Sequence, residues 1–166
     1  MIKTVPSIPQ ADLLLHSLRS VGYSEEAAVA DIVDNAISAF ASEIYIKFDW
    51  EKQVISIIDN GEGMEKEELY KNMQIGSVAP GAVRLSTDLG RFGLGMKTAA
   101  FSLGRHVAVA SAKGGNISNA VWDLDQVNKL GWQLIVEEDE KYDRYLHGIG
   151  DHGTAVIIST LDNLID

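Results

Sequence analysis

Residues 54–64 of the chain read VISIIDNGEGM, a mostly apolar run that ends in an aspartate followed by two alternating glycines. A short apolar run of this kind predicts a buried strand. Gly61 and Gly63 allow the backbone beyond it to come close to a flat ligand. Asp59 can then accept a hydrogen bond from the exocyclic amine of a purine, and Met64 can pack on the ring. The alternative, which this stretch alone favours, is a hairpin turn, because Asp-Asn-Gly is strong turn chemistry.

A helix is predicted before this strand, over residues 24–41, because an N-cap serine and two early glutamates precede a periodic apolar run. Within it Asp31 and Asn35 lie one turn apart on one face, with Asp34 close beside them. A carboxylate there can polarise a water, and an amide oxygen can complete the oxygen shell of Mg²⁺ alongside a triphosphate. The alternative is a capped helix with ordinary surface acids.

A third stretch, residues 90–98, reads GRFGLGMKT and places three glycines at the start of another predicted helix. Backbone amides and the positive end of a helix suit phosphate oxygens, and Lys97 or Arg91 would add charge. A P-loop requires glycine directly before Lys-Ser/Thr, but Met96 intervenes. A Rossmann fingerprint requires glycine where Thr98 stands. Both of these motifs are therefore excluded, and a flexible or tightly packed glycine turn is the remaining alternative.

The rest of the chain predicts a single domain over residues 1–166 with an α+β order of elements. Helices are predicted over residues 11–19, 65–73 and 93–102, strands over residues 43–49, 53–58, 106–112, 120–124, 132–137 and 154–159, and a mobile loop over residues 74–90. The first two strands are separated by three residues and predict a hairpin.

Composition narrows the class of protein. The chain has 166 residues, 46% of them apolar, and no cysteine, which is typical of one soluble domain outside an oxidising compartment. No signal peptide or run of roughly 18 apolar residues is present, so a cytoplasmic location without membrane contact is predicted. The net charge of −10 repels phosphate backbones, so nucleic acid is not an expected partner. A polyphosphate would be bound locally, by backbone amides, a helix N-terminus, a few basic side chains and a divalent cation.

One ligand can account for all three stretches, and their order along the chain resembles the GHKL superfamily of gyrase, the large heat-shock chaperone, histidine kinases and mismatch-repair MutL proteins. The resemblance implies that this ligand is Mg-ATP. The resemblance covers residues 31–154 and is closest to the microrchidia-like and chaperone-like bacterial branch. It implies the Bergerat fold, a two-layer α/β sandwich with a mixed, mostly antiparallel sheet and helices on one face. ATP or ADP would lie between the helical layer and a lid formed by residues 74–95.

The resemblance also implies a role for each motif. Asp31 corresponds to the acid that orients the attacking water, Asn35 to the magnesium-binding residue, and Ala39 to a position that packs against adenine. Asp59 corresponds to the residue that reads adenine. The remaining positions implied to contact the nucleotide are Gly61, Gly63, Met64, Gly90, Arg91, Phe92, Gly93, Leu94, Gly95, Met96, Lys97 and Thr154, the last through a shared water.

One departure from the family pattern leaves two functions open. Hydrolysing members carry glutamate where this chain has Asp31, whose side chain is shorter by one methylene, roughly 1.5 Å of reach. The first function is a Mg²⁺-dependent ATPase whose lid closure drives homodimerisation or acts on a partner domain. The second is an ATP-sensing module without appreciable turnover. Both expect downstream domains or partner proteins, with this chain as the N-terminal part of a longer protein. A histidine-kinase catalytic domain is a third alternative, for which the flanks of His16 do not match a phospho-accepting site.

Overall fold

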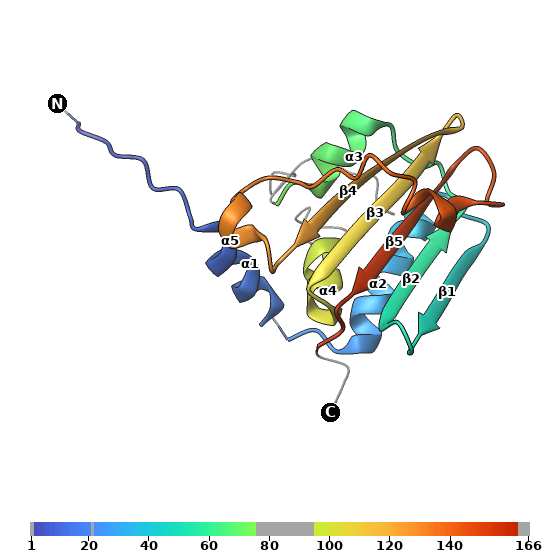
Figure 1. Cartoon of the computed structure of the whole chain (residues 1–166), viewed down its shortest axis with the longest axis horizontal. Helices are drawn as coiled ribbons and strands as arrows, with labels where there is room; N and C mark the ends of the chain where they lie inside the picture. Colours follow the sequence, from blue (N-terminus) through green and yellow to red (C-terminus); the bar gives the residue numbers. More distant parts are fainter. Residues whose placement is uncertain (1, 21, 76–94, 163–166) are drawn as a thin grey trace.

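The computed structural model describes residues 2–20, 22–75 and 95–162 of the chain. In this part of the chain five strands form one sheet, and the longer helices cover one of its faces (Figure 1). This confirms the predicted α+β sandwich. Every pairing between the described strands is antiparallel, in keeping with the mostly antiparallel sheet that the resemblance implies. The elements are α1 (Ala11–Arg19), α2 (Glu25–Ser38), β1 (Ile44–Asp49), β2 (Val54–Asp59), α3 (Lys66–Met73), α4 (Gly95–Leu103), β3 (His106–Lys113), β4 (Asn116–Asp123), α5 (Val127–Leu130), the 3₁₀ turn η1 (Asp143–Leu146) and β5 (Gly153–Ser159).

The order of strands across the sheet is β1-β2-β5-β3-β4, so the last strand in sequence lies at the centre. β5 pairs with β2 on one side and with β3 on the other. The two sequential hairpins, β1-β2 and β3-β4, therefore meet only through β5. This arrangement brings the end of the VISIID strand and the Gly153-Thr154 dipeptide next to each other.

α2 begins as the sequence predicts, since the Ser24 side chain accepts a hydrogen bond from the Ala27 amide at 3.2 Å. It ends at Ser38, a few residues before the predicted end, because Phe40 takes a left-handed conformation with φ 59° that stops the helix. Ala28, Ile32 and Ala36 form its buried face.

α4 is the central helix of the helical layer and packs directly against α2. All of its residues from Lys97 to Leu103 are buried. The small side chains of Ala99 and Ala100 let the helix lie close to its neighbours, while Phe101 fills the core between them. A helix buried all round cannot move far without opening the core, so α4 is a fixed element of the helical layer.

The two faces of the sheet bury different sets of residues, as the period of two along a strand requires. On the helix side lie Ile55, Ile57, Val107, Val109, Val156 and Ile158. On the other side lie Ile58, Ala108, Ala110, Ala155 and Ile157, which are covered by Tyr142 and Leu146 of the segment around η1. Because both faces of β2 are covered, its sequence is apolar rather than alternating.

The strand predicted over residues 132–137 is wrong. The segment lies along the outer edge of β4 and makes one isolated antiparallel bridge, between Ile135 and Val121. The Asn119 side chain then takes the place of a strand backbone, because its amide group donates to the Glu137 carbonyl and accepts from the Glu137 amide, both at 2.9 Å. A side-chain pairing of this kind leaves no trace in the local sequence pattern.

The other predicted elements agree with the structure within a few residues, apart from β4, which begins at Asn116 rather than at residue 120. Gly114 and Gly115 both have positive φ and form a tight turn that extends the β3-β4 hairpin into polar sequence. The predicted β1-β2 hairpin is confirmed. Most of the predicted mobile loop over residues 74–90 lies outside the described residues.

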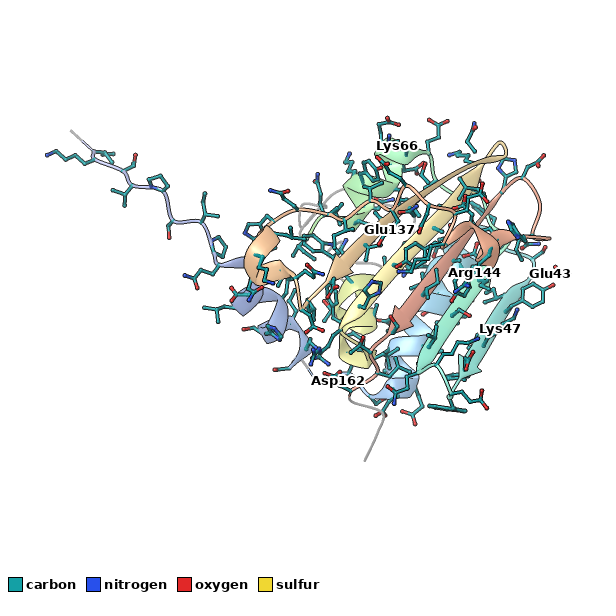
Figure 2. All side chains as sticks on the ribbon, in the orientation of Figure 1. Glu43, Lys47, Lys66, Glu137, Arg144 and Asp162 are labelled. Atoms are coloured by element: carbon teal, nitrogen blue, oxygen red, sulfur yellow. The ribbon has the colours of Figure 1, made fainter. Side chains whose placement is uncertain are left out.

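Residues 2–10 form no helix or strand and project away from the body of the domain (Figure 1). The Trp132 indole donates a hydrogen bond to the Pro9 carbonyl at 3.0 Å, where this segment joins α1. Near the C-terminal end of the described residues lies Asp162, which is labelled in Figure 2. Its carboxylate pairs with Arg19 of α1 and with Arg105. Among the described helices, none is long and apolar enough to cross a membrane.

Candidate functional site

A row of polar side chains crosses the middle of the sheet at one end. In the strand register Asp59 of β2 lies opposite Thr154 of β5, and Thr154 lies opposite Ser111 of β3. All three point to the helix side, because they are an even number of residues from Ile57, Val156 and Val109. The neighbouring inward positions of the three strands, Ile57, Val156 and Val109, are apolar, so the row marks a place where the fold keeps polar groups at a cost in burial.

Asp59 is the buried acceptor of the row, with 6% of its surface exposed. Its Oδ1 accepts a hydrogen bond from the Gly61 amide at 2.8 Å. Burial raises the pKa of Asp59, while hydrogen bonds from the backbone amides of Gly61 and Thr154 oppose that shift. A carboxylate fixed in this way can accept a hydrogen bond from the amino group of a flat base.

The glycines after Asp59 are required by close contacts. A Cβ on Gly61 would lie 2.8 Å from the Ala39 carbonyl oxygen, and one on Gly63, which has φ +64°, would lie 1.8 Å from the Ala112 carbonyl oxygen. The Glu62 amide donates to the same Ala39 carbonyl at 2.9 Å. The loop after β2 is therefore held against the C-terminal end of α2 on one side and against β3 on the other.

Asn60 holds this loop from the outside, a role that the sequence did not indicate. Its side-chain oxygen accepts hydrogen bonds from the amides of Ser42 and Glu43, both at 2.9 Å, and its amide group donates to the Ser42 hydroxyl. The only signal in the sequence is an asparagine in a turn motif, which predicts side-chain to backbone bonding but not the partner.

Ser111 is a second residue that the sequence analysis missed. It is fully buried, and its Oγ lies 2.8 Å from the Met64 amide, 3.1 Å from the Gly153 carbonyl oxygen and 2.8 Å from the Thr154 Oγ1. One hydroxyl therefore joins the loop after β2 to the start of β5. Alternation along β3 predicts an inward-facing serine, but its partners are distant in sequence.

Asp31 and Asn35 lie on α2 as predicted, with Asp31 half-buried and Asn35 exposed. The Tyr23 hydroxyl donates to Asp31 Oδ2 at 2.7 Å, and this hydrogen bond is the main cause that raises the pKa of Tyr23. A Cβ on Gly95 would lie 4.0 Å from the same Asp31 oxygen. The carboxylate thus faces the start of α4, and Tyr23 is a third residue missed in the sequence.

The glycine-rich stretch is only partly described. Gly90, Arg91, Phe92, Gly93 and Leu94 lie outside the described residues.

Gly95 is the first residue of α4, and Met96 packs partly against the core. The Lys97 ammonium is buried and donates to the Asn72 carbonyl near the end of α3, and burial lowers its pKa to about 8. Lys97 is thus bound to α3, and its predicted contact with phosphate stays a prediction.

The predicted site residues form two groups. Asp59 and Thr154, which the sequence predicts to meet the base, form one end on the sheet, named here the base end. The Asp31–Asn35 face of α2 together with Gly95, predicted to meet the phosphates, forms the other, named the phosphate end. Ala39, at the end of α2, contacts the Gly61 loop and joins the two. Within residues 2–20, 22–75 and 95–162 no group of three His, Cys, Asp or Glu side chains could hold a metal ion.

The chain is similar in sequence to several known proteins. Residues 23–154 match the protein family described as histidine kinase-, DNA gyrase B-, and HSP90-like ATPase. ATPase morc-1 of Caenorhabditis elegans is 35% identical over 94 residues, which cover 55% of this chain and 11% of that protein. Chaperone protein HtpG of Campylobacter jejuni is 29% identical over 174 residues, covering 80% of this chain and 28% of that protein. HtpG of Alkaliphilus oremlandii is 29% identical over 140 residues, covering 69% and 22% respectively. The chain thus spans about a quarter of the length of the chaperones that it matches, and less of the microrchidia protein.

Proposed function

Because this chain belongs to the histidine kinase-, DNA gyrase B- and HSP90-like ATPase family and is an ATP-binding domain of that kind, we propose that it binds Mg-ATP between the polar row of the sheet and α2, and that it hydrolyses the nucleotide. The observation that carries the proposal is the placement of Asp59 and Thr154 in adjacent strands, next to the end of the helix that bears Asp31 and Asn35.

Adenine recognition is assigned to the base end. Asp59 accepts a hydrogen bond from the adenine amino group, and Thr154 takes part directly or through one water. The close approach of the Gly61–Gly63 backbone to α2 and β3 leaves the position of Asp59 fixed before a ligand arrives. A site that is already ordered loses little conformational entropy on binding.

The phosphate end is suited to Mg²⁺ in the donor atoms it offers. Asn35 is exposed on α2 one turn from Asp31, and its amide oxygen is a ligand type that Mg²⁺ prefers. In this proposal Asn35 holds the ion together with phosphate oxygens. Bound Mg²⁺ would neutralise phosphate charge, which an acidic domain with a net charge of −10 otherwise repels.

Hydrolysis is assigned to Asp31 as the group that orients the attacking water. Its Oδ2 is held by Tyr23, which leaves Oδ1 to accept a hydrogen bond from that water. The absence of a side chain on Gly95 leaves room beside the carboxylate. Asp31 is shorter than glutamate, but its helix, α2, packs directly against α4, which begins at Gly95.

The second candidate is an ATP-sensing module without appreciable turnover. It is favoured by the aspartate at position 31, because a base displaced by roughly 1 Å commonly loses about 100-fold in rate. In either case we propose that nucleotide binding closes a lid over residues 74–95 and is coupled to homodimerisation or to further domains. Relatives that are named as chaperone and ATPase, and are several times longer than the aligned region, support that coupling.

Calorimetric titration with ATP and Mg²⁺, followed by measurement of phosphate release, tests the proposal. Wild-type protein is expected to bind, and Asp59→Asn is expected to weaken binding strongly. Asp31→Asn should abolish phosphate release while binding persists, and Asp31→Glu should retain it. Binding without release in the wild type would favour the sensing module. A folded protein that binds no adenine nucleotide would contradict both functions.

A further inference from the structure

The hydrogen bonds of Ser111 can be assigned a direction from the valence of its hydroxyl group. A serine hydroxyl donates one hydrogen bond and accepts up to two. Its three neighbours are the Met64 amide, which only donates, the Gly153 carbonyl, which only accepts, and the Thr154 hydroxyl, which can do either. Because Ser111 is fully buried, an unused partner has no water to replace it.

One arrangement satisfies all three contacts. The Met64 amide donates to Ser111, Ser111 donates to the Gly153 carbonyl, and Thr154 donates to Ser111. If Ser111 instead donated to Thr154, no proton would lie between Ser111 Oγ and the Gly153 carbonyl oxygen, and their 3.1 Å contact would not be a hydrogen bond. The buried network therefore favours a Thr154 hydroxyl whose proton points toward Ser111.

This direction determines what Thr154 offers to a ligand. With its single proton directed at Ser111, Oγ1 presents only lone pairs to the helix side of the sheet. Among the described residues, no other side-chain hydrogen bond of Thr154 is present. Asp59, its neighbour across the β2-β5 pairing, is an acceptor as well. The base end thus presents two adjacent acceptors.

We propose that Ser111 is a positioning residue that fixes the Thr154 hydroxyl as an acceptor, so that the site selects purines with an amino group at position 6 over those with an oxo group there. The inference deepens the proposed function and rests on it. A 6-amino group donates to acceptors directly or through one water, whereas a 6-oxo group meets them with a lone pair. A site built around such bonds discriminates by the groups it leaves unpaired.

The test compares the dissociation constants of ATP and of inosine triphosphate, which carries a 6-oxo group, at one Mg²⁺ concentration. In Ser111→Ala the Thr154 hydroxyl is free to rotate and to donate to an oxo group. The ratio of the two dissociation constants should therefore fall about threefold to tenfold, the effect of about one neutral hydrogen bond. Ser111→Thr keeps the hydroxyl and should restore the ratio. A role confined to stability would change both constants alike and leave their ratio intact.

Ser118→Ala is the matched control, because Ser118 lies opposite Ser111 in the β3-β4 register and makes no side-chain hydrogen bond within the described part of the chain. It should leave the ratio unchanged. Where Ser111→Ala does not fold, Ser111→Cys, a weaker donor of similar size, should lower the ratio in the same direction. An unchanged ratio in a folded Ser111 variant that still binds ATP would overturn the inference alone. Failure of the wild type to bind ATP would overturn it together with the proposed function.

Discussion

The base end and the phosphate end of the proposed site are built in different ways. At the base end Asp59 and Ser111 are buried, and each is bound to backbone groups of neighbouring strands and loops. At the phosphate end Asn35 is exposed and Asp31 is half-buried, with one tether from Tyr23. The first region has its geometry fixed by the core, so changes there should affect folding and recognition together. The second is a helix surface, where changes should affect turnover more than stability.

The largest effect is expected at Gly63. In Gly63→Ala the new Cβ would lie 1.8 Å from the Ala112 carbonyl oxygen at φ +64°, so the loop after β2 must move away from β3. The overlap and the left-handed conformation together should lower the free energy of unfolding by about 3 kcal/mol or more. Urea unfolding followed by circular dichroism measures this.

Gly148→Ala is the matched control for that variant. Gly148 has φ +83° with nothing within 4 Å of the added Cβ, so only the conformational cost of about 1 kcal/mol applies. Equal losses in the two variants would show that the contact with β3 contributes nothing, and the base end would then be no more rigid than an open turn.

Asp59→Asn should separate recognition from stability. ATP affinity should fall about 10-fold to 100-fold, because a charge-assisted hydrogen bond is lost. Burial raises the pKa of Asp59 in the folded protein. The contribution of Asp59 to the free energy of unfolding is therefore fully present while the carboxyl is protonated, and it is lost as pH rises through that raised pKa. The neutral asparagine avoids this loss. At pH 7 the variant should therefore be at least as stable as the wild type, and the difference should shrink as pH falls below the pKa of the unfolded chain. A variant that is clearly less stable at pH 7 would contradict the cause assigned to the shift.

Lys97→Met removes a buried ammonium group on α4, near the phosphate end, and tests how its burial affects stability. Burial lowers the pKa of Lys97 from 10.5 to about 8. Its contribution to the free energy of unfolding is therefore fully present above about pH 10.5, where the amine is neutral, and it is lost as pH falls through about 8. At pH 7 the variant should be more stable than the wild type by about 1–2 kcal/mol, after allowance for the lost hydrogen bond to Asn72. At pH 10 the gain should be largely absent. Lys71→Met serves as the control for loss of a lysine side chain, because Lys71 is exposed on α3.

The smallest effect is expected at Tyr23. Tyr23→Phe removes the hydroxyl that holds Asp31 and should lower kcat for ATP hydrolysis about fivefold, the effect of about 1 kcal/mol, with little change in KM. Measured phosphate release gives both constants. A fall in affinity without a fall in kcat would place Tyr23 in binding rather than in orientation of the water.

The elements that the sequence predicts correctly are those with a local signal. The apolar run before Asp59, the N-cap at Ser24 and the glycines at 61 and 63 each follow from a few adjacent residues, and the structure confirms the strand and the helix that they predict. The strand order, with β5 between the two hairpins, is a long-range property that no local pattern contains.

The missed residues share one cause, which is that their partners are remote or unspecific in the sequence. Ser111 binds Met64, which is 47 residues away, and Thr154, which is 43 residues away. Asn119 replaces a strand pairing with its side chain, so the segment over residues 132–137 has the alternation of a strand without being one. Polar residues in apolar strands thus mark sites, but only the register identifies what they bind.

The central place of β5 also bears on how the domain acquires its structure. β2 and β3 are completed long before Gly153–Ser159 is synthesised, yet neither has its inner neighbour until that strand arrives. During synthesis both hairpins therefore carry an unpaired inner edge with apolar residues on both faces, a surface prone to aggregation. Folding must wait for contacts between distant parts of the chain, which predicts slow folding for a domain of this size and a dependence on chaperones while the chain is emerging.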